Sequence, residues 1–144
     1  MNQPTVSVRM FDLCDSATIR SGLITAVNAG HGRISREEYP SPLDASIAVS
    51  IEIDGIQESF DAVVRIEIFD ESGVDSGINP FTTAVNIQPD PAKKSIEFDS
   101  YLLSLPIDSH ELEIPRAGTY RVELFVNETR LTYLRFKAIQ EEGA

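Results

Sequence analysis

The chain has 144 residues, enough for an apolar core of its own, and we expect a single domain over residues 1–144 with an ordered core at about 5–139. Apolar residues make up 42% of the chain and charged residues 24%, which argues against a disordered protein. The 23 Asp and Glu residues outnumber the 12 Lys and Arg residues. The resulting net charge of −11 disfavours binding to nucleic acid or to an anionic membrane surface, unless the basic residues cluster locally.

The chain begins with two short predicted strands. Residues 6–13 alternate apolar and polar side chains, with a phase slip at Met10 that predicts either a bulge or a strand buried on both faces. Residues 15–17 predict a turn, because Asp and Ser side chains bond to nearby backbone groups. Residues 23–27 predict the second strand.

A glycine-bearing loop follows and holds His31 between two glycines. Residues 34–39 allow two interpretations. Ser35 and Glu38 have capping-box spacing, which favours one turn of helix. Pro40 comes at once and ends any helix, so an irregular edge segment is the alternative.

The strongest pattern lies in the middle of the chain. Residues 45–53 and 60–68 each alternate apolar with mostly polar side chains, which is the period of a strand with one buried face. Residues 54–58 include a glycine and have the length of a hairpin loop. We therefore predict a long two-stranded hairpin whose apolar face needs a second layer to cover it.

The second half of the chain predicts further short strands separated by turns. Residues 70–73 and 106–113 read as connections, and the strand patterns fall at residues 84–88, 96–103, 119–126 and 134–138. The last two patterns form a hairpin around Asn127. Gly118 and Tyr120 resemble the tyrosine corner of immunoglobulin-like domains, in which the phenol bonds back to nearby backbone.

These patterns predict an all-β fold without a useful amphipathic helix. We expect about seven to nine strands, with turns roughly every ten residues, in a single antiparallel β-sandwich that is immunoglobulin-like in general architecture. The central and C-terminal hairpins would supply its facing layers. Cys14 is the only cysteine, so no intrachain disulfide exists, and the N-terminus shows no signal-peptide pattern. We therefore expect a cytoplasmic protein, with a virion as the alternative.

One passage resembles a known family. Residues 13–30 read Leu-Cys-Asp-Ser-Ala-Thr-Ile-Arg-Ser-Gly-Leu-Ile-Thr-Ala-Val-Asn-Ala-Gly, which looks like the opening of an uncharacterised group of small bacterial and phage proteins. The sequence departs from that group with Leu23, where Lys is common, and with His31, where Trp is common. The group is a domain of unknown function, so the resemblance implies an all-β single domain, suggests assembly into a phage particle, and supplies no active site.

Two loops carry the candidate ligand-binding residues. Carboxylates pooled at one end of a sandwich can bind calcium, which takes six to eight oxygen ligands, and Asp70, Glu71 and Asp75 are the candidates here. Ordinary turn chemistry explains the same residues equally well, and their spacing is not that of an EF-hand. His31 is a second loop candidate, although a turn with glycines of positive φ explains it too.

We find no motif of a hydrolase, a nucleotide-binding protein or a zinc protein, so we predict a non-catalytic protein without a cofactor. Val63, Phe125 and Tyr133 occupy otherwise polar strand faces and form an interaction patch if they are contiguous. The expected function is therefore a protein-interaction or structural module that binds a protein partner or itself. The alternative is a sandwich that binds calcium or a small ligand through the loops at His31 and at residues 70–75.

Overall fold

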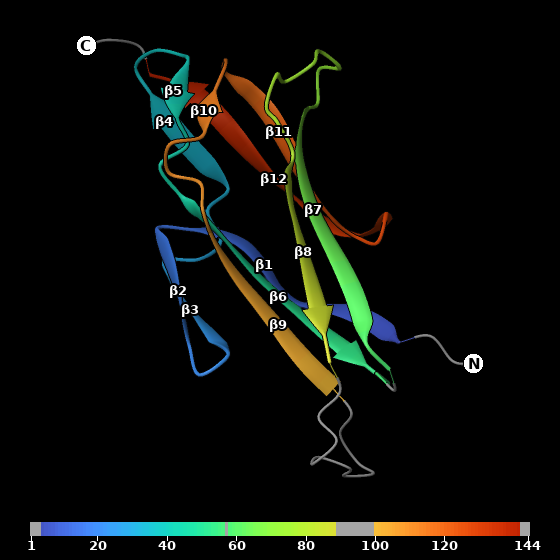
Figure 1. Ribbon diagram of the computed structural model, residues 1–144. Helices are drawn as coiled ribbons and strands as arrows, with labels where there is room; N and C mark the ends of the chain where they lie inside the picture. Colours follow the sequence, from blue (N-terminus) through green and yellow to red (C-terminus); the bar gives the residue numbers. More distant parts are fainter. Residues whose placement is uncertain (1–3, 57, 89–99, 142–144) are drawn as a thin grey trace.

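The apolar faces of two sheets meet in one core (Figure 1). The computed structural model describes residues 4–56, 58–88 and 100–141, and within these ranges it has twelve strands and no helix. The three-stranded sheet has the order β1–β6–β9, formed by Thr5–Cys14, Ser46–Asp54 and Ser100–Asp108. The five-stranded sheet has the order β4–β12–β11–β7–β8, formed by Arg33–Arg36, Thr129–Gln140, Gly118–Val126, Phe60–Asp70 and Phe81–Ile87.

Two small strand pairs complete the fold. β2 (Ser16–Arg20) and β3 (Leu23–Val27) form a hairpin, and β5 (Ser41–Pro42) pairs with β10 (Glu113–Ile114). The hairpin contacts β6 and β9, and Ser104 Oγ donates a hydrogen bond to the carbonyl of Gly22 at its tip. It thereby covers the outer face of β6, where Ser46 and Ser50 are buried although they point away from the core.

The predicted central hairpin is wrong. Its two strands exist almost where predicted, as β6 and β7, but β6 pairs with β1 and β9 while β7 pairs with β11 and β8. The connection between them therefore crosses from one sheet to the other. The alternation is real in both strands, because the apolar residues at every second position of 45–53, and most of those in 60–68, are buried in the common core.

The all-β class is confirmed, and several details of the prediction change. The phase slip in β1 is a register shift between Val8 and Met10, which is the bulge that was one of the two alternatives. The C-terminal hairpin is also confirmed, as β11 and β12 joined at Asn127 and Glu128, both with positive φ. Residues 34–39 contain no helix: β4 is instead an edge strand that runs parallel to β12, so the sheets are not purely antiparallel.

Two other differences concern where strands begin and end. The turn expected at residues 15–17 contains the start of an additional strand, β2, so the described ranges have more strands than the seven to nine expected. β9 ends at Asp108, inside the region 106–113 that was predicted as a connection. Positions 96 and 98 of the predicted strand 96–103 lie outside the described residues. The described ranges have no helix, hence none that could cross a membrane.

Candidate functional site: an arginine–aromatic sheet face

The outer face of the five-stranded sheet carries arginine and aromatic side chains. Ile66 and Ile68 of β7 and Val122 and Leu124 of β11 are buried in the core, so the residues between them point to the opposite side. We call the following group the arginine–aromatic face: Arg65, Glu67, Phe69, Arg121, Glu123, Phe125, Arg130, Tyr133 and Arg135.

Tyr133 lies at the centre of three guanidinium groups. The guanidinium carbons of Arg121, Arg130 and Arg135 are 6.0, 5.6 and 5.5 Å from the centroid of its ring. Tyr133 is 45% exposed, so its ring and the arginines around it meet solvent together. Cations at this distance from an aromatic face are attracted by the ring quadrupole, which holds the three arginines close to one another despite their like charge.

Glu123 lies opposite Tyr133 in the β11–β12 register and is buried below the arginines. Its Oε1 accepts a hydrogen bond from Nη1 of Arg130 at 2.9 Å and lies 3.1 Å from Nε of Arg121. The second contact has ion-pair distance but not hydrogen-bond geometry, and the buried Nε–H of Arg121 has no hydrogen-bond acceptor among the described residues. Glu123 thus pairs with two arginines but accepts a hydrogen bond from only one of them, Arg130.

The remaining arginines of the face also have carboxylate partners. Arg65 stacks over Phe125, with 4.2 Å from its guanidinium carbon to the ring centroid, and pairs with Glu67. Arg135 pairs with Glu71 of the following loop. Among the residues that the structure describes, three guanidinium groups surround Tyr133, and two carboxylates, Glu123 and Glu71, pair with them. The local charge is positive in a protein whose net charge is −11.

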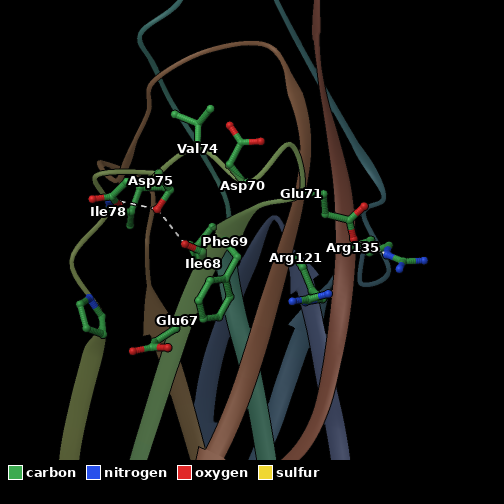
Figure 2. Close-up of a pocket in the computed structure, with 13 residues that line it drawn as sticks. Glu67, Ile68, Phe69, Asp70, Glu71, Val74, Asp75, Ile78, Arg121 and Arg135 are labelled. Atoms are coloured by element: carbon green, nitrogen blue, oxygen red, sulfur yellow. Dashed lines mark hydrogen bonds and ion pairs between the residues drawn. The ribbon is translucent and has the colours of Figure 1, made fainter.

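A hollow of about 770 Å³ adjoins this face where β7 ends (Figure 2). The loop between β7 and β8 forms one side, with Val74 and Ile78, while Phe69, Arg121 and Arg135 of the arginine–aromatic face form the other. Figure 2 shows Phe69 and Arg121 next to each other at its base. The hollow thus continues the face and gives it depth.

The acidic turn next to the hollow holds its carboxylates apart. Asp70 is nearly buried: its Oδ1 accepts the backbone N–H of Ser72 at 2.9 Å, and its Oδ2 accepts a hydrogen bond from Nε of Arg116 at 2.7 Å. The Ser72 hydrogen bonds and the Arg116 charge lower the pKa of Asp70, against the opposing effect of burial. Asp75 accepts the backbone N–H of Gly77, as in an ordinary Asx turn.

The structure therefore gives each predicted calcium-binding carboxylate a separate partner. Among the residues that it describes, no group of three or more His, Cys, Asp or Glu side chains is placed to hold a metal ion. His31 is not among the residues that line the hollow beside this turn.

Both histidines meet at Asp15 instead. Nε2 of His31 is 3.0 Å from the Asp15 carboxylate, and a ring nitrogen of His110 is 2.7 Å from the Asp15 carbonyl oxygen. Nδ1 of His110 lies 2.6 Å from Asp108, and this hydrogen bond is the main cause that raises the pKa of His110. Cys14, buried beside Asp15, has its pKa raised by desolvation.

The predicted interaction residues Val63, Phe125 and Tyr133 all lie on the outer side of the five-stranded sheet. Phe125 and Tyr133 are members of the arginine–aromatic face. Val63 is 41% exposed and lies beyond Arg65 along β7, where its backbone bonds to Asn127. Sequence reasoning missed the arginines, although Arg65, Arg121 and Arg135 stand at alternating positions of well-predicted strands.

Comparisons with known proteins describe a family rather than a function. A search of curated protein sequences found no match. The chain is similar in structure to part of the Pseudomonas fluorescens alkylpurine DNA glycosylase AlkC, with 13% identity over 93% of this chain and 30% of that one, at a TM-score of 0.44. It is also similar to part of a Bacteroides uniformis beta-glucuronidase, with 9% identity over 96% of this chain and 13% of that one, at a TM-score of 0.37.

The chain thus spans less than a third of either enzyme, and likenesses this weak say nothing about its function. A family model, in contrast, matches residues 9–139 and so covers nearly all of the described fold. This match confirms the resemblance to an uncharacterised group. The chain belongs to DUF6941, a family of unknown function.

Proposed function

We propose that this protein is a non-catalytic interaction module that binds another protein through the arginine–aromatic face. The observation that carries the proposal is Tyr133, half-exposed and surrounded by three guanidinium groups. Arginine and aromatic residues are enriched at protein–protein interfaces and supply most binding hot spots. The adjoining hollow gives a partner side chain a place to enter.

A protein partner fits this face better than a nucleic acid. The basic residues do cluster here, which is the condition under which the net charge would not disfavour nucleic acid. However, Glu67, Glu71 and Glu123 stand among the arginines and already pair with them. A phosphate backbone crossing the face would approach these carboxylates as well, whereas a protein segment can place its charges selectively.

The finer description of the fold is part of the same proposal: one immunoglobulin-like sandwich domain, with the two larger sheets as its layers. The shared core supports it, and so does Tyr120, whose hydroxyl donates a 2.7 Å hydrogen bond to the carbonyl of Arg116 four residues upstream, as in a tyrosine corner. Assembly into a phage particle, suggested by the sequence resemblance, stays a prediction, and recovery of the chain in purified particles is its test.

Site-specific photo-crosslinking tests the interaction proposal. Tyr133 is replaced by the photoreactive amino acid benzoylphenylalanine in the cells that naturally carry the protein. The matched control places the same group at Thr18, which is exposed on β2 away from the face. We expect a covalent adduct with one defined protein from position 133 and not from position 18, and we expect Arg130→Gln to reduce it.

The mass of the adduct, and its identity by mass spectrometry, distinguish a second copy of this chain from a different protein. Equal labelling from both positions, or no adduct from position 133, would refute an interaction through this face.

A further inference from the structure

We propose that the partner presents an acidic segment, and that the arginine–aromatic face seats one of its carboxylates among Arg121, Arg130 and Arg135, over Tyr133. This inference rests on the proposed function and names the chemistry of the partner. On this inference the face recognises a single carboxylate at a defined position and is not a general basic surface.

The charge balance around Tyr133 is the first argument. Three guanidinium groups lie within 6.0 Å of the ring centroid, and the two carboxylates paired with them are Glu123 and Glu71. One positive charge therefore lacks a counter-charge, and the buried Nε–H of Arg121 lacks an acceptor within the described part of the chain. A carboxylate from outside would supply the missing charge and, on a small reorientation of Arg121, an acceptor.

The position of the carboxylates already present is the second argument. Glu123 is buried below the ring of arginines, while Glu71 belongs to the loop at the edge of the hollow. Glu71 holds Arg135 in the way that a carboxylate of the partner would hold it. A partner carboxylate thus competes with Glu71 for Arg135, but it does not compete with Glu123, which stays beneath Arg121 and Arg130.

The apolar side chains beside the arginines indicate which partner residues lie next to that carboxylate. Phe69 is 37% exposed and Val74 is 56% exposed, and both line the hollow that Arg121 and Arg135 also line. An apolar side chain of the partner would bury these surfaces while its acidic neighbour meets the arginines. The matching segment therefore combines acidic with aromatic or aliphatic residues. A polyanion with a charge at every position would instead meet Glu67 and Glu71.

Fluorescence anisotropy with a labelled synthetic peptide tests the inference. The probe is an eight-residue peptide of alternating Glu and Tyr, and the comparison probe alternates Gln and Tyr. At low salt we expect the Glu peptide to bind about tenfold more tightly, and we expect added salt to reduce this preference. Arg135→Gln should weaken binding of the Glu peptide about fivefold, whereas Glu71→Gln should strengthen it by releasing Arg135.

Arg9→Gln is the matched control. Arg9 is an exposed arginine of β1 in the other sheet and pairs with Glu52 as Arg135 pairs with Glu71, so the variant changes the net charge equally. Circular dichroism checks that each variant is folded. Binding should be unchanged in Arg9→Gln. Equal binding of the Glu and Gln peptides, or an equal loss in Arg9→Gln and Arg135→Gln, would overturn the inference.

An eight-nucleotide oligothymidylate that binds as tightly as the Glu peptide would also overturn it, in favour of nucleic acid. If the Glu peptide fails while crosslinking at position 133 still selects one partner, the interaction module stands and only its preference for a carboxylate is refuted. If crosslinking fails as well, both proposals fall.

Discussion

Replacing Asp70 by Asn should destabilise the protein by removing the charge that anchors the β7–β8 loop. Asp70 is the last residue of β7, and its nearly buried carboxylate accepts hydrogen bonds from Ser72 and from Arg116. Arg116 also donates to the backbone carbonyl of Asp75, so the pair ties the loop to the chain segment before β11. The amide oxygen of Asn can keep the Ser72 bond, but its NH₂ group would face the guanidinium.

The expected loss follows from the contact with Arg116. A hydrogen bond to a charged group contributes about 1.5–3 kcal/mol, and because the Arg116 side chain is 39% exposed, solvent screens part of this interaction. We therefore expect the free energy of unfolding of Asp70→Asn to fall by about 2 kcal/mol at pH 7, which is about 7 °C in Tm for a chain of this length.

The dependence on pH identifies the charge as the cause. The folded-state pKa of Asp70 is lowered from its ordinary 3.8, so its contribution is fully present above that value and is lost as the pH falls through the lowered pKa. Urea denaturation of both proteins, followed by circular dichroism, should show a constant difference from pH 7 to about pH 5 and a shrinking one below about pH 4.

The matched control is Asp75→Asn, which lies in the same loop, is exposed, and keeps the Asx-turn bond to Gly77. Its free energy of unfolding should stay within about 0.5 kcal/mol of the parent. A difference for Asp70→Asn that is the same at pH 7 and pH 3, or that is absent at pH 7, would refute the role of the charge.

Two further predictions concern single hydrogen bonds. Tyr120→Phe keeps the ring stacked on Phe136 and removes the hydroxyl that bonds to Arg116, so urea denaturation should show a free energy of unfolding lower by about 1 kcal/mol. Tyr101→Phe, at an exposed tyrosine, is the control and should show no loss. An equal loss in both variants would contradict the tyrosine corner. For His110, an NMR titration should give a midpoint above 6.5, which Asp108→Asn lowers, because the bond to Asp108 raises the pKa. Because the folded-state pKa is raised, the hydrogen bond between His110 and Asp108 contributes to stability below pH 6.5, and this contribution disappears as the pH rises through the midpoint. A midpoint at or below 6.5 would contradict the raised pKa.

The sequence predicted the strands better than their pairing. Alternation in residues 45–53 and 60–68 arises because each strand has one face in the core, and this holds whether two strands lie side by side or face each other. A short loop with a glycine suits a hairpin and equally suits a crossing between sheets. The small polar residues on the outer face of β6 also indicated a face exposed to solvent. In the structure they are buried under the β2–β3 hairpin, where Ser50 and Ser104 approach each other.

The candidate site was predicted only in its apolar part. Phe125 and Tyr133 were found because an aromatic residue at an outward position of a strand departs from the pattern. Arg121, Arg130 and Arg135 conform to the same pattern as ordinary polar residues, so alternation gave no reason to single them out. Their convergence depends on the register between β11 and β12, including the shift after Leu124, and no local pattern encodes that register.

Stability alone does not explain the arrangement around Glu123. Burying a carboxylate on the outer face of a sheet costs desolvation free energy, and a buried ion pair often stabilises no more than apolar residues of the same size. Placing three arginines around one exposed tyrosine adds repulsion between like charges, which Glu123 and Glu71 offset only in part. Leu or Thr at these positions would suit a solvent-facing sheet with less strain. The acidic partner that we propose would supply the negative charge that this surface lacks, in a protein whose own net charge is −11.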